Sequence, residues 1–322
     1  MPFLAAPSVA LAWLGRQGTR ALAAVVFLAI VVPPLDAVLR PFVTEAIFAL
    51  LCIAFVRVDT ADLRTHFKKP GLVLAATVWT SLVLPSLIGA ACLFTQLDVR
   101  SPDLFLAIML QAIASPMMAA PAFAAVMGLD ATLVLTTLVA STAIMPATAP
   151  LFAYVFVGPA LTLSPQALGL KLFAILAGSL LVAIVLRRFV GLAELLRYNA
   201  QINGLNILLV FIFVAAVMQD VAARFVADPA IMLGLTVFAF ALSFAVLGLT
   251  ALLFARAGRE RAFVLGLMAS QRNMGLMLAA TGGALPALTW LYFALAQFPI
   301  YVSPLLLSSL ARRLTASGGK KR

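Results

Sequence analysis

Charged residues are scarce in this chain, and their scarcity excludes a soluble protein. Only 10% of its 322 residues are Asp, Glu, Lys or Arg, whereas 64% are hydrophobic. A soluble domain carries roughly 25% charged and roughly 45–50% apolar residues. The apolar runs are long and reach the roughly 20 residues that a helix needs to span a bilayer. We therefore expect an all-α polytopic membrane protein.

Residues that serve catalysis or metal binding are also few. The chain has one histidine and two cysteines. His66 falls in a basic loop, and Cys52 and Cys92 lie inside apolar runs without the spacing of a metal site or a redox pair. No Ser/His/Asp set and no phosphate-binding loop is present. The sequence therefore predicts neither an enzyme nor a resident cofactor.

The apolar runs predict ten membrane spans. Their approximate limits are residues 21–39, 41–56, 71–95, 103–127, 130–157, 166–186, 202–220, 229–255, 261–283 and 285–311. Ten spans divide into two halves of five, which must then have opposite orientations, as in many transporters with inverted repeats. The predicted organisation is an N-terminal segment 1–20, repeats 21–157 and 158–313, and a basic tail 314–322.

The basic residues orient these spans, because Lys and Arg gather in cytoplasmic loops. With the N-terminus inside, the cytoplasmic side holds Arg16, Arg20, Arg57, Arg64, Lys68, Lys69, Arg187, Arg188, Arg197, Arg256, Arg259, Arg261, Arg312, Arg313, Lys320, Lys321 and Arg322. The other side holds only Arg40, Arg100, Lys171 and Arg224. We expect both termini to be cytoplasmic, in a multi-pass protein of a bacterial inner membrane. Topology then explains the net charge of +11, with lipid and not nucleic acid as the neighbour.

Polar residues interrupt two spans at their middle. Span four contains Ser115-Pro116 followed by Pro121, and span nine contains the run Ser270–Asn273. Proline breaks or kinks a helix, and broken backbone at membrane depth is tolerated only where protein buries it or where it lines a cavity. The two segments align at an offset that superposes Ala114 and Ser115 on Ala269 and Ser270. Broken helices at matching positions of two repeats indicate a transporter binding site.

Arg272 is the most informative residue of these breaks. A charged side chain at the bilayer centre costs about 2.5–3.5 kcal/mol on insertion scales, so it needs a cavity or a partner. Every acidic residue falls in a loop or near a span end. Two interpretations stay open: Arg272 is a fixed cation for a substrate anion, or it is a structural arginine bound to the free carbonyls of the broken helix.

Other polar residues in the spans are less specific. Thr136, Thr137, Ser141 and Thr142 form a hydroxyl-bearing stretch in span five, and Gln111 lies one turn before Ser115. Such hydroxyls often bond only to their own or a neighbouring helix.

With these features the chain resembles the bile acid:sodium symporter family over roughly residues 20–313. The segment Phe55–Pro70 is similar to the family's loop after the second helix, and Asn273-Met274-Gly275-Leu276 resembles its Asn-Ser-Gly-Leu in the ninth. Ser115-Pro116, Gly128, Asp130 and Ser141-Thr142 resemble its fourth and fifth helices. The resemblance implies a panel of spans one, two, six and seven, and a core of the other six spans in which spans four and nine cross at their breaks. It also implies transport of organic anions by alternating access, commonly with sodium.

The departures from the family fall on its sodium ligands. The Glu five residues before the Asn of the ninth helix is Met268 here, and the Gln just before that Asn is Arg272. Pro121 and Ala122 replace the Ser-Asn ligands of the fourth helix, and Thr80 stands for a Gln of the third. Replacing a carboxylate by a guanidinium makes cation binding repulsive. We therefore expect the usual sodium sites to be lost, although Thr80 and Thr142 could retain a displaced one.

The sequence thus favours a carrier of a small or amphipathic organic anion that does not use the usual sodium sites. The expected substrate-binding residues are Ser115, Thr137, Ser141, Ser270, Gln271, Arg272 and Asn273. Two alternatives remain: a sodium-coupled symporter with relocated sites, and a sensor or partner subunit that keeps the fold without transport. No obligate protein partner is expected.

Overall fold

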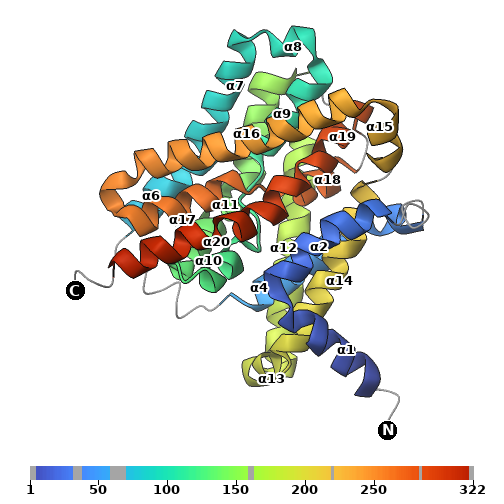
Figure 1. Cartoon of the computed structure of the whole chain (residues 1–322), viewed down its shortest axis with the longest axis vertical. Coiled ribbons are helices and arrows are strands. Elements are labelled where there is room, and N and C mark those ends of the chain that lie inside the picture. Colours follow the sequence, from blue (N-terminus) through green and yellow to red (C-terminus); the bar gives the residue numbers. More distant parts are fainter. Residues whose placement is uncertain are drawn as a thin grey trace. The chain divides into compact units, whose positions relative to one another are not determined.

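The chain folds almost entirely into helices (Figure 1). The computed structural model describes residues 5–31, 38–58, 70–158, 163–218, 221–282 and 285–318. Within these ranges there is no strand, and the only extended pairing is a single bridge between Pro116 and Arg272. Outside the described residues lie Arg64, His66, Lys68, Lys69, Lys320, Lys321, Arg322 and most of the Phe55–Pro70 segment.

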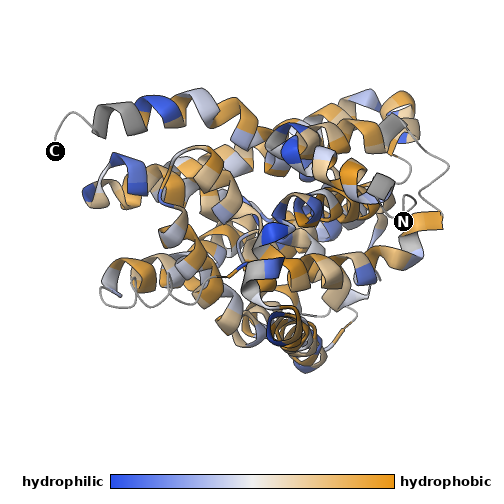
Figure 2. Ribbon diagram, turned by 90° about the horizontal axis from the view of Figure 1, so that it is seen from below, coloured by the Kyte–Doolittle hydropathy of each residue, from blue (hydrophilic) through white to orange (hydrophobic). Residues whose placement is uncertain are grey.

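Within the described ranges, six helices are long and apolar enough to cross a membrane. They span Pro70–Phe94, Ala131–Val157, Pro165–Val190, Asn199–Val217, Pro229–Leu253 and Ala287–Leu314. Hydrophobic residues cover most of the ribbon (Figure 2), and many large apolar side chains are exposed, such as Phe173 and Leu252. Apolar surface on this scale suits lipid and not water. The chain is therefore an all-α, multi-pass membrane protein.

The remaining predicted spans coincide with shorter or broken helices. The first two correspond to α2 (Gly18–Val31) and α4 (Val43–Val56). Span four is split into α9 (Pro102–Ile113) and α10 (Ala120–Val126), and span nine into α17 (Arg259–Ser270) and α18 (Met274–Thr281). The other elements are η2 (Arg40–Phe42), α6 (Gly71–Val78), η3 (Trp79–Val83), α7 (Leu84–Phe94), α8 (Leu97–Arg100), α11 (Ala131–Phe152), η4 (Ala153–Val157), α12 (Pro165–Val190), α13 (Leu192–Arg197), α14 (Asn199–Val217), α15 (Val221–Ala227), α16 (Pro229–Leu253), η6 (Ala255–Ala257), α19 (Ala287–Leu295) and α20 (Gln297–Gly318).

An N-terminal helix, α1 (Ala5–Arg16), lies within the segment 1–20 that the sequence leaves without a span. It packs along α14 at two glycines. A side chain at Gly15 would collide with the carbonyl oxygen of Ala200, and one at Gly204 with that of Leu11. Small residues of this kind let two membrane helices approach closely.

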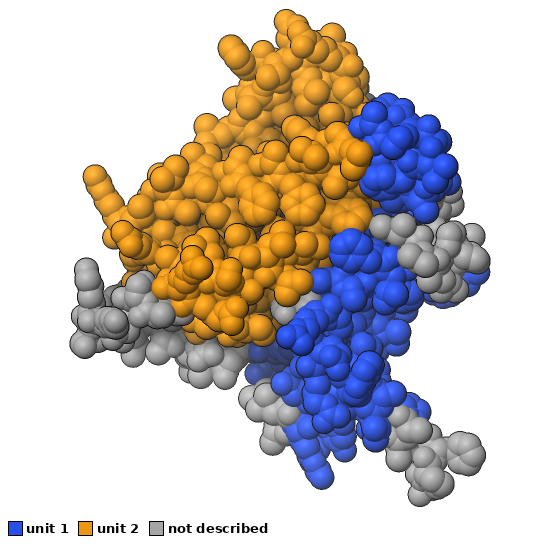
Figure 3. Space-filling view, viewed as in Figure 1, with its two compact units in different colours: residues 1–58, 174–232 blue, residues 59–173, 233–322 orange. Residues whose placement is uncertain are grey.

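The chain divides into two compact units, which Figure 3 colours separately. Unit 1 comprises residues 1–58 and 174–232, and unit 2 comprises residues 59–173 and 233–322. Unit 1 thus contains α1, α2, α4 and α14, and unit 2 contains α6 to α11 and α17 to α20. The division between the units falls within α12, after Phe173, and within α16, after Met232. The panel and core that the family resemblance implies stay a prediction. Each predicted repeat contributes helices to both units.

One hydrogen bond within each unit joins the end regions of two helices that are distant in the sequence. In unit 2, Thr289 at the start of α19 donates to the backbone oxygen of Asp103 at the start of α9, at 2.7 Å. In unit 1, Arg187 near the end of α12 donates to the backbone oxygen of Val58, just after α4, at 2.6 Å. The alternation of ten spans, which would place each pair on one side of the membrane, stays a prediction.

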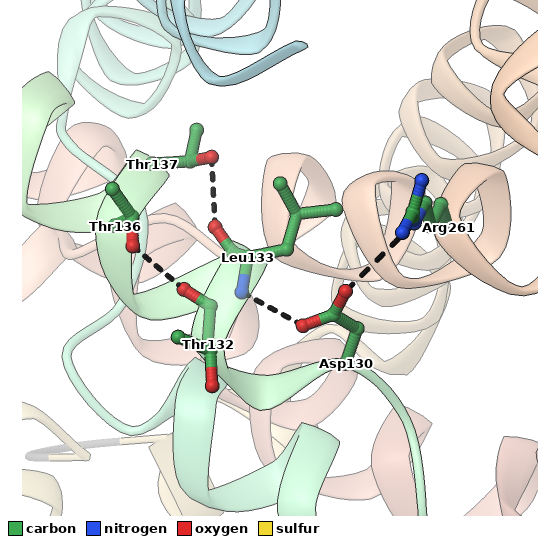
Figure 4. A network of polar contacts seen from close by, with 6 residues as sticks. All are labelled: Asp130, Thr132, Leu133, Thr136, Thr137 and Arg261. Atoms are coloured by element: carbon green, nitrogen blue, oxygen red, sulfur yellow. Dashed lines mark hydrogen bonds and ion pairs between the residues drawn. The ribbon is translucent and has the colours of Figure 1, made fainter. Parts of the chain in front are cut away.

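A third such contact involves Asp130, whose carboxylate has two partners (Figure 4). Its Oδ1 accepts a hydrogen bond from the backbone N–H of Leu133 at 3.0 Å and so caps the N-terminus of α11. Its Oδ2 lies 3.8 Å from Nε of Arg261 in the first turn of α17, a side chain that is 56% exposed. An exposed ion pair contributes about 0–1 kcal/mol, whereas an N-cap contributes typically about 1 kcal/mol.

The cap should therefore matter more to stability than the ion pair. We expect Asp130→Ala to lower the free energy of unfolding by about 1 kcal/mol or slightly more, and Asp130→Asn to stay close to wild type, since asparagine also caps. Chemical denaturation in detergent measures both, with Arg261→Ala as the control that removes only the ion pair. Equal losses in Asp130→Asn and Asp130→Ala would show that the ion pair dominates.

Candidate functional site

The two broken helices pair with each other at their breaks. After α9 the backbone is extended at Ala114, and after α17 it is extended at Gln271. The N–H of Met117 donates to the oxygen of Gln271, and the N–H of Asn273 donates to the oxygen of Ser115, each at 2.8 Å. Backbone groups that left their helices thus satisfy one another, as burial at membrane depth requires.

The position of Pro116 in this pairing explains why proline fits there. Pro116 and Arg272 lie opposite each other, and both hydrogen bonds come from the residues that flank them. In an antiparallel bridge of this kind, the N–H and C=O groups of the central residues point away from the partner. The missing N–H of proline therefore costs no hydrogen bond in the bridge.

Arg272 turns its side chain toward two free backbone carbonyls within unit 2. Its Nη1 donates to the oxygen of Ala114 at 3.0 Å and to that of Thr80 at 3.1 Å. The side chain is buried, with 4% exposed, and its Nη2 has no hydrogen-bond partner among the described residues. One half of the guanidinium is thus anchored in the protein while the other half is unpaired.

Each carbonyl that Arg272 binds is free for a local reason. The oxygen of Ala114 is released because α9 ends one residue earlier. Thr80 lies in the π-helical turn η3, where the N–H of Leu84 donates to the oxygen of Trp79 instead of that of Thr80. The next residue, Pro85, has no N–H to offer. Turns of this type interrupt helices frequently at functional sites.

A small cavity in unit 2 adjoins the guanidinium. It is lined by α7, α9, α16 and α17, with room for about one water molecule. Its polar wall consists of Gln111, Ser243, Ser270 and Arg272, and the rest is apolar. The cavity is therefore a narrow, mostly apolar space with one cationic side.

Two residues of this wall were not among the predicted site residues. Gln111 stood out in the sequence only as a polar residue, and Ser243 in α16 gave no signal because serine is common in membrane helices. The hydroxyl of Tyr292 donates a hydrogen bond to Oε1 of Gln111. This bond uses the oxygen of the Gln111 amide, whose nitrogen carries two further N–H donors.

The other predicted residues of the breaks have different surroundings. Ser115 and Gln271 do not line the cavity, and their side-chain polar atoms are buried without hydrogen-bond partners. Asn273 caps α18, because its Oδ1 accepts from the N–H of Leu276 at 3.1 Å. Ser270 does line the cavity, although its hydroxyl donates to the oxygen of Leu267.

The predicted hydroxyl residues form a separate group on η3 and α11. Thr137 donates to Leu133 of its own helix, and Thr80 lies 3.1 Å from the hydroxyl of Ser141. The buried hydroxyls of Thr77 and Thr142 have no partner in the described structure. None of these side chains lines the cavity beside Arg272.

Arg272 has no acidic partner among the described residues. Among residues whose burial is described, it is the only charged side chain that is buried, and neither described ion pair includes it. No group of three His, Cys, Asp or Glu side chains that could hold a metal occurs in the described ranges. Among the described residues, the partners of this positive charge are therefore the two carbonyl dipoles of Thr80 and Ala114.

Comparison of the chain with protein-family models and with curated proteins finds no match.

The role of Pro85 can be tested by replacing it with a residue that has a backbone N–H. In Pro85→Ala this N–H would point toward the Thr80 oxygen, five residues earlier, and compete with Arg272 for it. We expect Arg272→Gln to cost at least about 1 kcal/mol less stability in the Pro85→Ala background than in wild type, since the carbonyl keeps a partner. Denaturation midpoints of the four proteins in the double-mutant cycle measure the difference.

Thr80→Val is the matched control for this cycle. It removes the hydroxyl bond to Ser141 but keeps the carbonyl that Arg272 binds. The cost of Arg272→Gln should therefore be unchanged in the Thr80→Val background. An additive result for Pro85→Ala would refute the competition for the Thr80 oxygen.

Proposed function

We propose that this protein is a secondary transporter that carries a small or amphipathic organic anion across the membrane. The observation that carries the proposal is Arg272, a buried cation without an acidic partner at the crossing of two broken helices, with one half of its guanidinium unpaired. A buried charge needs compensation, and an anionic ligand supplies it. Residues of this kind mark substrate pathways in membrane proteins.

The architecture supports the same proposal. Two helices broken near their middle and joined at the breaks are typical of transporter binding sites. The division into two units, with α9, α10, α17 and α18 all in unit 2, is compatible with alternating access by the movement of one unit against the other. Together with the resemblance of the sequence, these features favour the bile acid:sodium symporter fold over a membrane enzyme.

We further propose that transport does not use the family's usual sodium sites. Thr80 stands where the resemblance expects a sodium-binding Gln, and its backbone oxygen binds Arg272 instead. The guanidinium would then take the place of a dissociable cation. A second cation a few ångströms away would be repelled by several kcal/mol even at an effective dielectric constant of about 20.

A sodium-coupled symporter remains the second candidate. Thr77 and Thr142 lie close in sequence to Thr80 and Ser141, and their buried hydroxyls have no hydrogen-bond partner among the described residues. Thr77 and Thr142 could each offer an oxygen to a displaced ion. Hydroxyl oxygens without a carboxylate form a weak site for a cation, which is why this candidate ranks second.

Uptake into proteoliposomes tests these proposals together. We expect some member of a panel of radiolabelled monocarboxylates and sulfonates to accumulate at equal rates with sodium or choline as the external cation. Arg272→Gln should reduce this uptake at least about tenfold, the equivalent of one lost charge-assisted hydrogen bond. Arg261→Gln removes the same charge from an exposed position and should transport normally.

Three results would contradict parts of the proposal. Unchanged uptake in Arg272→Gln would remove Arg272 from the substrate site. Uptake that requires sodium would favour the displaced cation site of Thr77 and Thr142. Binding of an anion to the purified protein without any translocation would favour the sensor on the same fold.

A further inference from the structure

The cavity beside Arg272 is far smaller than an organic anion. It has room for about one water molecule and lies entirely within unit 2, between α7, α9, α16 and α17. Ile88, Ile108 and Val246 are among its apolar lining residues. A carboxylate with a carbon skeleton would have to widen it, whereas a halide ion is only a little larger than a water molecule.

The cavity wall offers hydrogen-bond donors on its polar side. Arg272 lines the cavity, and its Nη2 carries two N–H groups without a hydrogen-bond partner among the described residues. Gln111 lines the cavity with an amide whose oxygen accepts from the hydroxyl of Tyr292 and whose nitrogen carries two N–H groups that can donate. Ser243 adds a hydroxyl from α16. Donors from α9, from α16 and from the break after α17, together with a net positive charge, suit an anion and disfavour a cation.

No acidic side chain in the described ranges neutralises this wall. None of the residues that line the cavity is acidic, and among the residues with described burial no Asp or Glu is buried. A water molecule could accept hydrogen bonds from Nη2, but it would leave the guanidinium charge uncompensated. A buried unpaired charge is costly, so an occupant with one negative charge is favoured over water.

We propose that this cavity binds one chloride-sized inorganic monoanion as the counter-ion of Arg272. The ion is held by Nη2 of Arg272, the amide of Gln111 and the hydroxyl of Ser243. A divalent anion such as sulfate is excluded by its size and by its second, uncompensated charge. The site goes beyond the proposed function, because it follows from the size and charge of the cavity whether or not the chain transports an organic anion.

Equilibrium dialysis of the purified full-length protein against radioactive chloride tests the site directly. The buffer keeps sodium and ionic strength constant and replaces chloride by gluconate, which is too large for the cavity. We expect saturable binding of about one chloride per chain, with bromide as a competitor and sulfate without effect. A matching rise of the unfolding temperature should follow, because the ion binds the native state.

Three variants separate this site from general salt effects. Arg272→Gln removes the charge, and Ser243→Val removes a donor and fills the cavity while Arg272 is kept. Each should weaken chloride binding at least about tenfold. Arg261→Gln loses the same charge at an exposed position and should bind chloride as wild type does. If Arg272→Gln fails to fold, Ser243→Val still decides the question.

The chloride site and the proposed function can fail separately. Absence of saturable chloride binding in wild type, or undiminished binding in Ser243→Val, would overturn the chloride site. Uptake of an organic anion in chloride-free proteoliposomes is measured independently of this result. Chloride binding without any organic-anion uptake would overturn the proposed function and leave the chloride site intact.

Discussion

A backbone that leaves helical geometry inside a membrane must find a partner for every N–H and C=O group, and the centre of unit 2 is arranged around this constraint. The breaks after α9 and α17 meet it by bonding to each other across the Pro116–Arg272 bridge. The hydrogen bonds of this pairing come only from the residues that flank Pro116 and Arg272. Proline therefore fits in the break after α9, and the side chain of Arg272 is not needed for the pairing. Arg272 can therefore serve a second purpose without disturbing the bridge.

That second purpose is to connect three segments that are distant in the sequence. Through Nη1 the guanidinium joins the break in span nine to the oxygen of Ala114 in span four and to that of Thr80 in the turn η3. A free cation bound between such carbonyls would perform the same task, but it could dissociate. A cation attached to the chain cannot, so it stays at the crossing whatever the sodium content of either compartment.

Sequence reasoning could locate the breaks but not the surroundings of Arg272. Proline and a run of polar residues interrupt an apolar span visibly, so the breaks near Ser115 and Arg272 were predicted where they occur. The anchoring carbonyl of Thr80 was missed, because it depends on a π-helical turn that only Pro85 hints at in the sequence. Ser243 was missed for a different reason: the cavity gathers four helices, and a single serine carries no sign of which helices its span will contact.

The fixed charge also bears on how a transporter with this site would be driven. With a monoanion bound, the guanidinium and its ligand are neutral together, whereas the empty site carries an uncompensated positive charge. Moving an uncompensated charge through a low-dielectric region is costly, and it is opposed or favoured by the membrane potential at about 2.3 kcal/mol per charge for each 100 mV. On the proposed function, the loaded protein would therefore change its access more readily than the empty one. Such a difference favours the exchange of one anion for another over net transport in one direction. With a chloride in the cavity, the guanidinium would also be neutralised while the protein returns without its organic substrate.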